Sequence, residues 1–172
     1  MNKTNQMKKI CLSVVISVSL LIGSNRLQAQ DTGTKLNQVE LIKQFASNWR
    51  GEIGKDTTAF WEIKSNGSGL ECNYRYVAKD KMVMEGKQLW VYDKKVDKFM
   101  LSSATNGMDS WISGFWFTSK NKSIIVPFSY ISNPEKAPFI LEMEFKSPEM
   151  FIQKTIVNNS IVKTDTYNRV KN

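Results

Sequence analysis

The stretch Trp111-Ile112-Ser113-Gly114-Phe115-Trp116-Phe117 is the part of the sequence that decides the fold class. Successive side chains of a β-strand point to opposite sides, so one face would carry its odd-numbered residues and the other its even-numbered residues. Both faces then carry aromatic rings. This composition is typical of a strand that is covered on both sides, or of one that lines a cavity and contacts a cover behind it.

A series of similar short strands precedes and follows this stretch. Asn66-Gly67 is a strong hairpin signal, and Asn106-Gly107 and Asn158-Asn159 mark further turns. In the clearest half-buried strand, apolar residues alternate with Glu142 and Glu144, which we expect to face water. The predicted strands are 49–53, 57–64, 70–78, 82–91 with a bulge at Gly86, 98–105, 109–118, 123–130, 139–146, 150–157 and 161–170.

One short amphipathic helix is predicted at about 36–47, where apolar residues recur at helical spacing and Asn37 with Glu40 fits a capping box. We expect this helix to plug or lean on the end of a sheet. The short links between strands favour an up-and-down order, and closing such a sheet removes its exposed edges. The sequence therefore predicts an all-β fold: a single up-and-down antiparallel β-barrel of about ten strands with one short N-terminal helix.

The N-terminus has the composition of a secretory signal peptide. Three lysines precede an apolar run from Ile10 to Ile22, and Ala29 supplies a small residue at the expected cleavage point. The run is shorter than the ~20 residues of a transmembrane helix, and an uncleaved anchor is the alternative interpretation. We therefore expect residues 1–29 to be a signal peptide. Residues 30–172 would form one exported domain, periplasmic or secreted, that is not membrane-spanning after cleavage.

The composition argues against several classes of function. Removal of residues 1–29 lowers the net charge from +8 to +4, because this segment carries four basic residues and no acidic one. Basic and acidic residues are interleaved in the remainder, so no basic stripe of the kind that binds nucleic acid is present. The chain has no histidine, which removes His-dependent catalytic triads, His-ligated zinc and haem held by a proximal His. We expect no cofactor and no metal.

Two further candidates for chemistry are weak. Cys72 is the only cysteine after cleavage, so an intramolecular disulfide cannot form. A reactive thiol needs exposure and a nearby cation, but Cys72 lies among apolar residues and Arg75 falls on the other face of its strand. We expect Cys72 to be buried and inert. Glu62 and Glu71 on neighbouring strands could pair for acid–base chemistry, but carboxylates on such strands usually face water.

The helix is followed by Asn48-Trp49-Arg50-Gly51-Glu52-Ile53, and the chain closes with Thr166-Tyr167-Asn168-Arg169-Val170. This order resembles the lipocalin-like (calycin) superfamily, in particular the small bacterial lipocalin-like domains of unknown function. There, a Trp on the first strand packs at the closed end of the barrel and an Arg near the end of the last strand lies across it. The resemblance implies structural roles for Trp49 and Gly51, with Arg169 over the indole, where a cation–π contact contributes ~0.5–2 kcal/mol.

The chain departs from the lipocalin pattern at Ser47, where lipocalins usually carry glycine, and it lacks their disulfides. It also resembles, more distantly, the ten-stranded fatty-acid-binding proteins. In those proteins an Arg and a Tyr two residues apart hold the carboxylate of the ligand. Tyr167 and Arg169 have this spacing in the reverse order.

The interior of the barrel is the candidate binding site. A ten-stranded barrel is wider than an eight-stranded one, which side chains just fill, and this slightly favours a cavity over a filled core. Small-molecule sites have mostly apolar walls with a few polar groups. The candidate ligand-binding residues are Tyr74, Tyr76, Trp111, Phe115, Phe117, Met143, Tyr167 and Arg169, with Phe139, Leu141 and Phe145 as further lining residues. Lys163 and Asp165 share a strand face with Tyr167, and they either supply polar groups to a ligand or face solvent.

These features favour an exported small-molecule-binding protein that holds a hydrophobic or amphipathic ligand inside a β-barrel. The alternative is a non-catalytic envelope interaction module that binds another protein through Trp90, Tyr92 and Trp116 as exposed aromatic anchors. A third hypothesis is an enzyme that works without histidine, but no residue is singled out as catalytic. The sequence does not specify the ligand or the oligomeric state.

Overall fold

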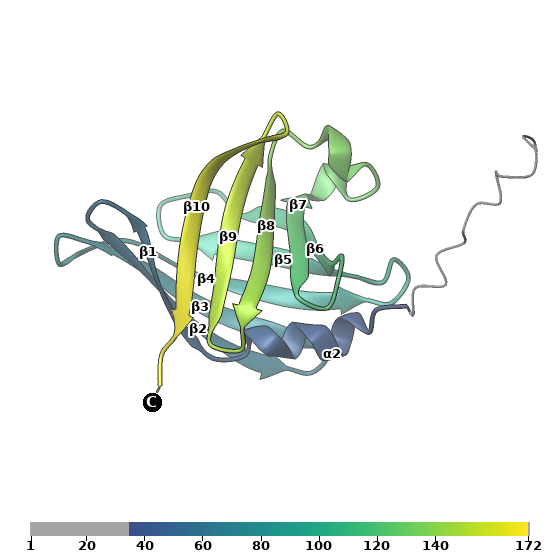
Figure 1. The fold of residues 1–172 in the computed structure, drawn as a ribbon, viewed down its shortest axis with the longest axis horizontal. Coiled ribbons are helices and arrows are strands. Elements are labelled where there is room, and N and C mark those ends of the chain that lie inside the picture. Colours follow the sequence, from purple (N-terminus) through teal and green to yellow (C-terminus); the bar gives the residue numbers. More distant parts are fainter. Residues whose placement is uncertain (1–34, 172) are drawn as a thin grey trace, which may run out of the picture. The chain divides into compact units, whose positions relative to one another are not determined.

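The computed structural model describes residues 35–171, and the predicted signal peptide lies outside these residues. The described chain forms one closed antiparallel barrel preceded by a short helix (Figure 1). The helical segments are α2 (Gln38–Ile42), η1 (Lys43–Phe45), η2 (Phe128–Tyr130) and η3 (Pro134–Lys136). The strands are β1 (Asn48–Gly54), β2 (Thr57–Asn66), β3 (Gly69–Ala78), β4 (Lys81–Asp93), β5 (Lys98–Thr105), β6 (Trp111–Phe117), β7 (Lys122–Pro127), β8 (Ile140–Ser147), β9 (Met150–Val157) and β10 (Ser160–Arg169).

Each strand pairs with the next along the chain, and β1 also pairs with β10 to close the sheet. In this closing pair Trp49 lies opposite Arg169, and on its other side Trp49 lies opposite Trp61 of β2. The predicted up-and-down antiparallel β-barrel is therefore confirmed, and a closed ten-stranded barrel is consistent with a calycin-like fold. Among residues 35–171, no helix is long and apolar enough to cross a membrane.

The N-terminal helix closes one end of the barrel. The Asn37 side chain caps α2 by accepting a hydrogen bond from the backbone N–H of Glu40 at 3.1 Å. The Gln38 side chain pairs with the backbone of Phe117 in both directions, because its Nε2 donates to the carbonyl at 3.1 Å and its Oε1 accepts from the N–H at 2.7 Å. These bonds fix the helix to β6, and Phe45 then reaches into the barrel, where it is completely buried. The regular α-helix is shorter than predicted, because its last turn tightens into a 3₁₀ turn.

The aromatic stretch forms β6 and is covered on both faces from Ser113 to Phe117, whereas Trp111 and Ile112 at its start are exposed. Ser113, Phe115 and Phe117 point into the barrel and are buried. On the outer face, the segment after β7 covers Gly114, where a Cβ atom would lie 2.5 Å from the Ile131 side chain. The Lys98 Nζ lies 3.8 Å from the Trp116 ring centroid and donates a hydrogen bond to the Ile131 carbonyl at 2.7 Å. These contacts hold the segment after β7 against β6.

Two details of the predicted strands are wrong. The extra residue of β4 is Val83 and not Gly86, because the register shift falls where Tyr76 pairs with Met84 and Val77 pairs with Met82. Gly86 is regularly paired with Tyr74, whose ring lies across it and occupies the space that a side chain would need. The strand predicted at 123–130 ends at Pro127, after which the chain turns into η2. Proline has no N–H to donate to a further ladder bond.

Candidate functional site at the open end of the barrel

The two ends of the barrel differ in how they are filled. At the closed end, next to α2, the Phe45 ring packs against Trp90, Phe115, Phe117, Phe145 and Phe151, with ring centroids 4.7–6.2 Å apart. At the opposite, open end lie the β1–β2, β3–β4, β5–β6, β7–β8 and β9–β10 connections. The aromatic residues therefore fill the end of the barrel next to α2, and we call the opposite end the open end.

The predicted pair of Trp49 and Arg169 lies at the closed end. The Arg169 guanidinium carbon is 4.7 Å from the Trp49 ring centroid, and its side chain also donates to the carbonyls of Pro148 and Gln44 at 2.9 and 3.2 Å. The Trp49 indole donates to the Phe45 carbonyl at 2.8 Å. Arg169 thus joins the helix, β1 and the β8–β9 turn across the closed end, and it does not point into the open end.

The eight predicted ligand-binding residues divide into three groups. Phe115, Phe117, Met143 and Tyr167 are buried in the core, and Arg169 covers the closed end from outside. Tyr74 is also buried, and its hydroxyl shares a short hydrogen bond with Thr105. Tyr76 and Trp111 face the open end and keep partial exposure, and the Trp111 ring contacts that of Phe139 at 5.8 Å. Only Tyr76 and Trp111 are therefore directly accessible to a ligand.

The polar wall of the open end is built mainly by β9 and β10. Asp165 lies on the inner face with Tyr167 and is only 5% exposed, so the interpretation that it faces solvent is wrong. Its carboxylate forms an ion pair with the Lys163 ammonium, with 2.8 Å between Lys163 Nζ and Asp165 Oδ2. The Lys163 side chain is 48% exposed. Gln153 and Thr155 lie opposite these two residues and are half-buried. We call Tyr76, Trp111, Gln153, Thr155, Lys163 and Asp165 the mouth of the barrel.

Three buried polar atoms on the inner face have no hydrogen-bond partner among the described residues. They are Trp61 Nε1, Ser103 Oγ and Ser123 Oγ. A buried polar group that makes no hydrogen bond costs roughly 1–3 kcal/mol. The sequence interpretation did not include these three residues. Their inward direction could have been found by extending the alternation from Phe99 and Leu101 to Ser103, and from Ile125 back to Ser123.

Burial also affects the ionisation of Tyr76 and Tyr167. It raises the pKa of Tyr76 to about 12, an effect that the nearby Trp61 N–H partly offsets and that the charge of Asp165 reinforces. Burial also raises the pKa of Tyr167, to which the neighbouring Tyr76 and Asp165 contribute. Both phenols therefore stay neutral at physiological pH and can donate hydrogen bonds.

Cys72 is 1% exposed, and burial raises the pKa of its thiol to about 12. We predict that the folded protein without residues 1–29, which include the other cysteine, Cys11, does not react with a thiol reagent such as DTNB at pH 8, because Cys72 forms almost no thiolate and its sulfur is covered. The unfolded chain, with an ordinary thiol pKa near ~8.5, should react within minutes under the same conditions. Absorbance of the released thiolate measures both rates, and rapid labelling of the native protein would contradict the buried position.

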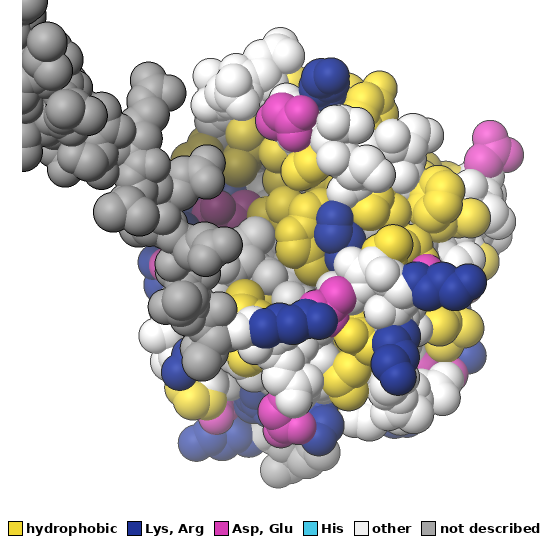
Figure 2. Space-filling view, turned by 90° about the vertical axis from the view of Figure 1, so that its right-hand side faces the viewer, with side chains coloured by type: hydrophobic (Ala, Val, Ile, Leu, Met, Phe, Trp, Pro, Cys, Tyr) yellow, Lys and Arg dark blue, Asp and Glu magenta, His cyan; other side chains and the backbone are white. Residues whose placement is uncertain are grey.

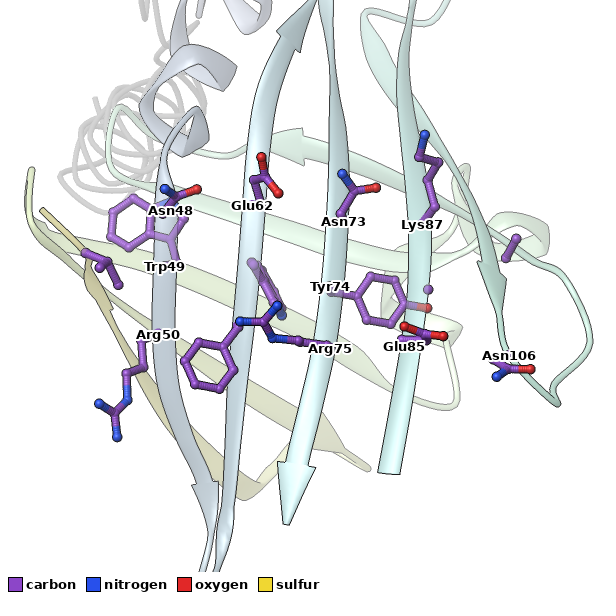
Figure 3. Close-up of a pocket in the computed structure, with 15 residues that line it drawn as sticks. Asn48, Trp49, Arg50, Glu62, Asn73, Tyr74, Arg75, Glu85, Lys87 and Asn106 are labelled. Atoms are coloured by element: carbon purple, nitrogen blue, oxygen red, sulfur yellow. The ribbon is translucent and has the colours of Figure 1, made fainter. Parts of the chain in front are cut away.

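A groove of about 1070 Å³ lies on the outer wall of β1–β4, and we call it the outer groove (Figure 3). Arg50, Phe60, Arg75 and Glu85 form one cross-strand row of its lining. The guanidinium carbons of Arg75 and Arg50 lie 5.0 and 5.9 Å from the Phe60 ring centroid. Alternation places these side chains on the solvent side, so the groove is separate from the mouth.

Glu62 and Glu71, which were expected to face water, lie on the outer face of the barrel. Glu62 lies in the outer groove and is bound to Lys64 at 2.6 Å, whereas Glu71 is bound to Lys87 at 2.7 Å. Each carboxylate is therefore paired with a lysine on the outside of the barrel. Glu142 and Glu144 also lie on the outer face, where Lys154 contacts them at 3.1 and 3.6 Å. Among residues 35–171, no group of three or more acidic or cysteine side chains has the geometry to hold a metal ion.

The chain matches no protein-family model, and no curated protein matches its sequence.

Proposed function

We propose that this chain is an exported, lipocalin-like protein that binds a hydrophobic or amphipathic small molecule in the open end of its barrel. The observation that carries the proposal is the mouth itself. Side chains that point inward there, such as Tyr76 and Lys163, remain partly exposed, whereas those at the closed end are fully packed.

The arrangement suits a molecule with an apolar and a polar part. Tyr76 offers an apolar surface on the inner face, and Trp111 with Phe139 offers a second one at the rim. Lys163, Asp165 and Gln153 supply polar groups between them. Burial of an apolar chain gains about 25 cal/mol per Å² of surface removed from water, and a few polar contacts then fix its orientation.

Native mass spectrometry of the exported protein tests this proposal. We expect a small molecule that stays bound to the folded chain and is released on unfolding. Thr155→Trp should prevent the binding, because a large ring on the inner face fills the mouth. Thr164→Trp is the matched control, because Thr164 is exposed on the outer face of the neighbouring strand. Retention of the molecule by the Thr155→Trp variant would place its site elsewhere.

A second candidate function is docking of another protein on the outside of the barrel. The anchors expected from the sequence do not support it: Trp90 is 1% exposed, Lys98 covers Trp116, and the Tyr92 hydroxyl donates to Asp97. Other outer apolar side chains are exposed, namely Leu89, Val91, Ile112 and Phe128. Figure 2 shows hydrophobic side chains open to solvent between charged ones on one face of the molecule. A partner that co-purifies with wild type but not with Val91→Lys would favour this function.

A further inference from the structure

We propose that the mouth selects ligands that carry a positively charged amine, and that the Lys163 ammonium occupies the position of that amine until such a ligand displaces it. This inference rests on the proposed function and specifies the class of ligand. The observation that supports it is that Asp165 is buried whereas its ion-pair partner, Lys163, is half exposed.

The negative charge of the pair is fixed and the positive charge is mobile. Asp165 is 5% exposed and is held on the inner face of β10 between neighbouring strands. The Lys163 side chain is 48% exposed, and its four-carbon stem can swing into water. A ligand can therefore replace the lysine, whereas it cannot replace the aspartate. The ammonium of Lys163, 2.8 Å from the Asp165 oxygen, marks where a cation is stabilised.

Replacement of the Lys163 ammonium by a ligand ammonium beside Asp165 should cost little free energy. The buried carboxylate keeps a positive partner throughout, so no unpaired charge is left inside the barrel. The released Lys163 ammonium regains its hydration at the rim. A ligand carboxylate in the same place would instead lie beside Asp165, and two like charges at such a distance repel each other strongly. A neutral head group would gain no ion pair.

The rings around Asp165 favour the same class of ligand. Tyr167 lies two residues from Asp165 on the inner face of β10, Trp61 packs on Tyr167, and the Asp165 charge contributes to the raised pKa of Tyr76 and Tyr167. Aromatic faces attract cations, and the attraction grows when water is excluded. The charged groups that face the mouth from its packed strands are Asp165 and Lys163, whereas Glu142, Glu144 and Lys154 pair on the outer face. Asp165 is thus the inner charge that a ligand meets.

Competition against an uncharged solvatochromic dye, Nile red, tests the inference. The competitors are dodecylamine, dodecanol and dodecanoate, which share one alkyl chain and are used below their micelle concentrations. We expect wild type to bind the amine at least about ten-fold more tightly than the alcohol, a difference of ~1.4 kcal/mol, and the acid most weakly. Asp165→Asn should remove the preference for the amine over the alcohol. Lys163→Met should raise the affinity for the amine several-fold, because the competing ammonium is gone.

Asp80→Asn is the matched control, because Asp80 is exposed in the β3–β4 turn at the same end of the barrel and its change alters the net charge equally. It should leave all three affinities unchanged. Preference of wild type for dodecanoate, or an unaltered amine preference in a folded Asp165→Asn variant, would overturn the inference. If Asp165→Asn does not fold, loss of amine affinity in Lys163→Met would overturn it. Failure of wild type to bind the dye or any of the three amphiphiles would overturn the proposed function as well.

Discussion

Replacement of Phe45 by alanine should lower the free energy of unfolding by about 3–5 kcal/mol, the usual cost of a large cavity in a packed core. Phe45 is 0% exposed and belongs to a 3₁₀ turn that follows a single turn of α-helix. Its ring contacts five aromatic rings from β4, β6, β8 and β9. A helix this short has little stability of its own, so loss of this ring should also loosen the whole segment from the barrel.

Urea denaturation followed by tryptophan fluorescence measures this effect. Phe128→Ala is the matched control, because it removes the same ring from a position that is 56% exposed, and we expect a change within ~0.5 kcal/mol. Equal destabilisation by the two substitutions would contradict the role of Phe45 as the central packed ring of the closed end.

Replacement of Gly51 by alanine should lower the free energy of unfolding by about 1–3 kcal/mol, although the added group is a single methyl. A Cβ at Gly51 would lie 2.7 Å from the Tyr167 ring and 3.0 Å from the Thr166 carbonyl oxygen. The Tyr167 ring cannot yield easily, because it is stacked on Phe151 at 4.7 Å with 8° between the planes and also packs on Trp61. The new methyl group must therefore push apart β1 and β10, the pair that closes the barrel.

Gly54→Ala on the same strand is the control for this substitution. No atom lies within 4 Å of the position that its Cβ would take. The added methyl there should be neutral or should stabilise the protein by ~0.4–1 kcal/mol, because alanine restricts the unfolded chain. Thermal unfolding of the two variants should thus shift in opposite directions or by clearly different amounts. A Gly51→Ala variant as stable as wild type would contradict the tight contact between β1 and Tyr167.

The fold was largely predictable because alternation of apolar and polar residues directly reports which strand face is buried. The strands Lys98–Thr105 and Met150–Val157 have the bounds expected from the sequence. β10 and β1 close the barrel through residues far apart in the chain, and this pairing followed from the need to remove exposed edges. The bulge was misplaced because a glycine was interpreted as an irregularity, whereas Gly86 makes room for Tyr74.

The candidate site was less predictable than the fold. Alternation places Phe115 and Met143 inside the barrel but does not tell whether they border a cavity or a packed floor. Whether they border a cavity depends on how far each residue lies from the ends of the barrel. It also depends on Phe45, which the helical segment places against Phe115. The burial of Asp165 beside an exposed Lys163 also depends on which end of the barrel the helix closes. The outer groove has no sequence signal, because it arises from the shape of the wall of β1–β4.

A crystal structure of the protein with dodecylamine is the most direct test of the account. We expect the ligand in the open end of the barrel, with its ammonium within hydrogen-bond distance of the Asp165 carboxylate and Lys163 turned outward. The alkyl chain should lie against the rings of Tyr76 and Trp111. A ligand bound only in the outer groove near Arg75 and Phe60, or a barrel whose mouth remains closed to it, would contradict the account.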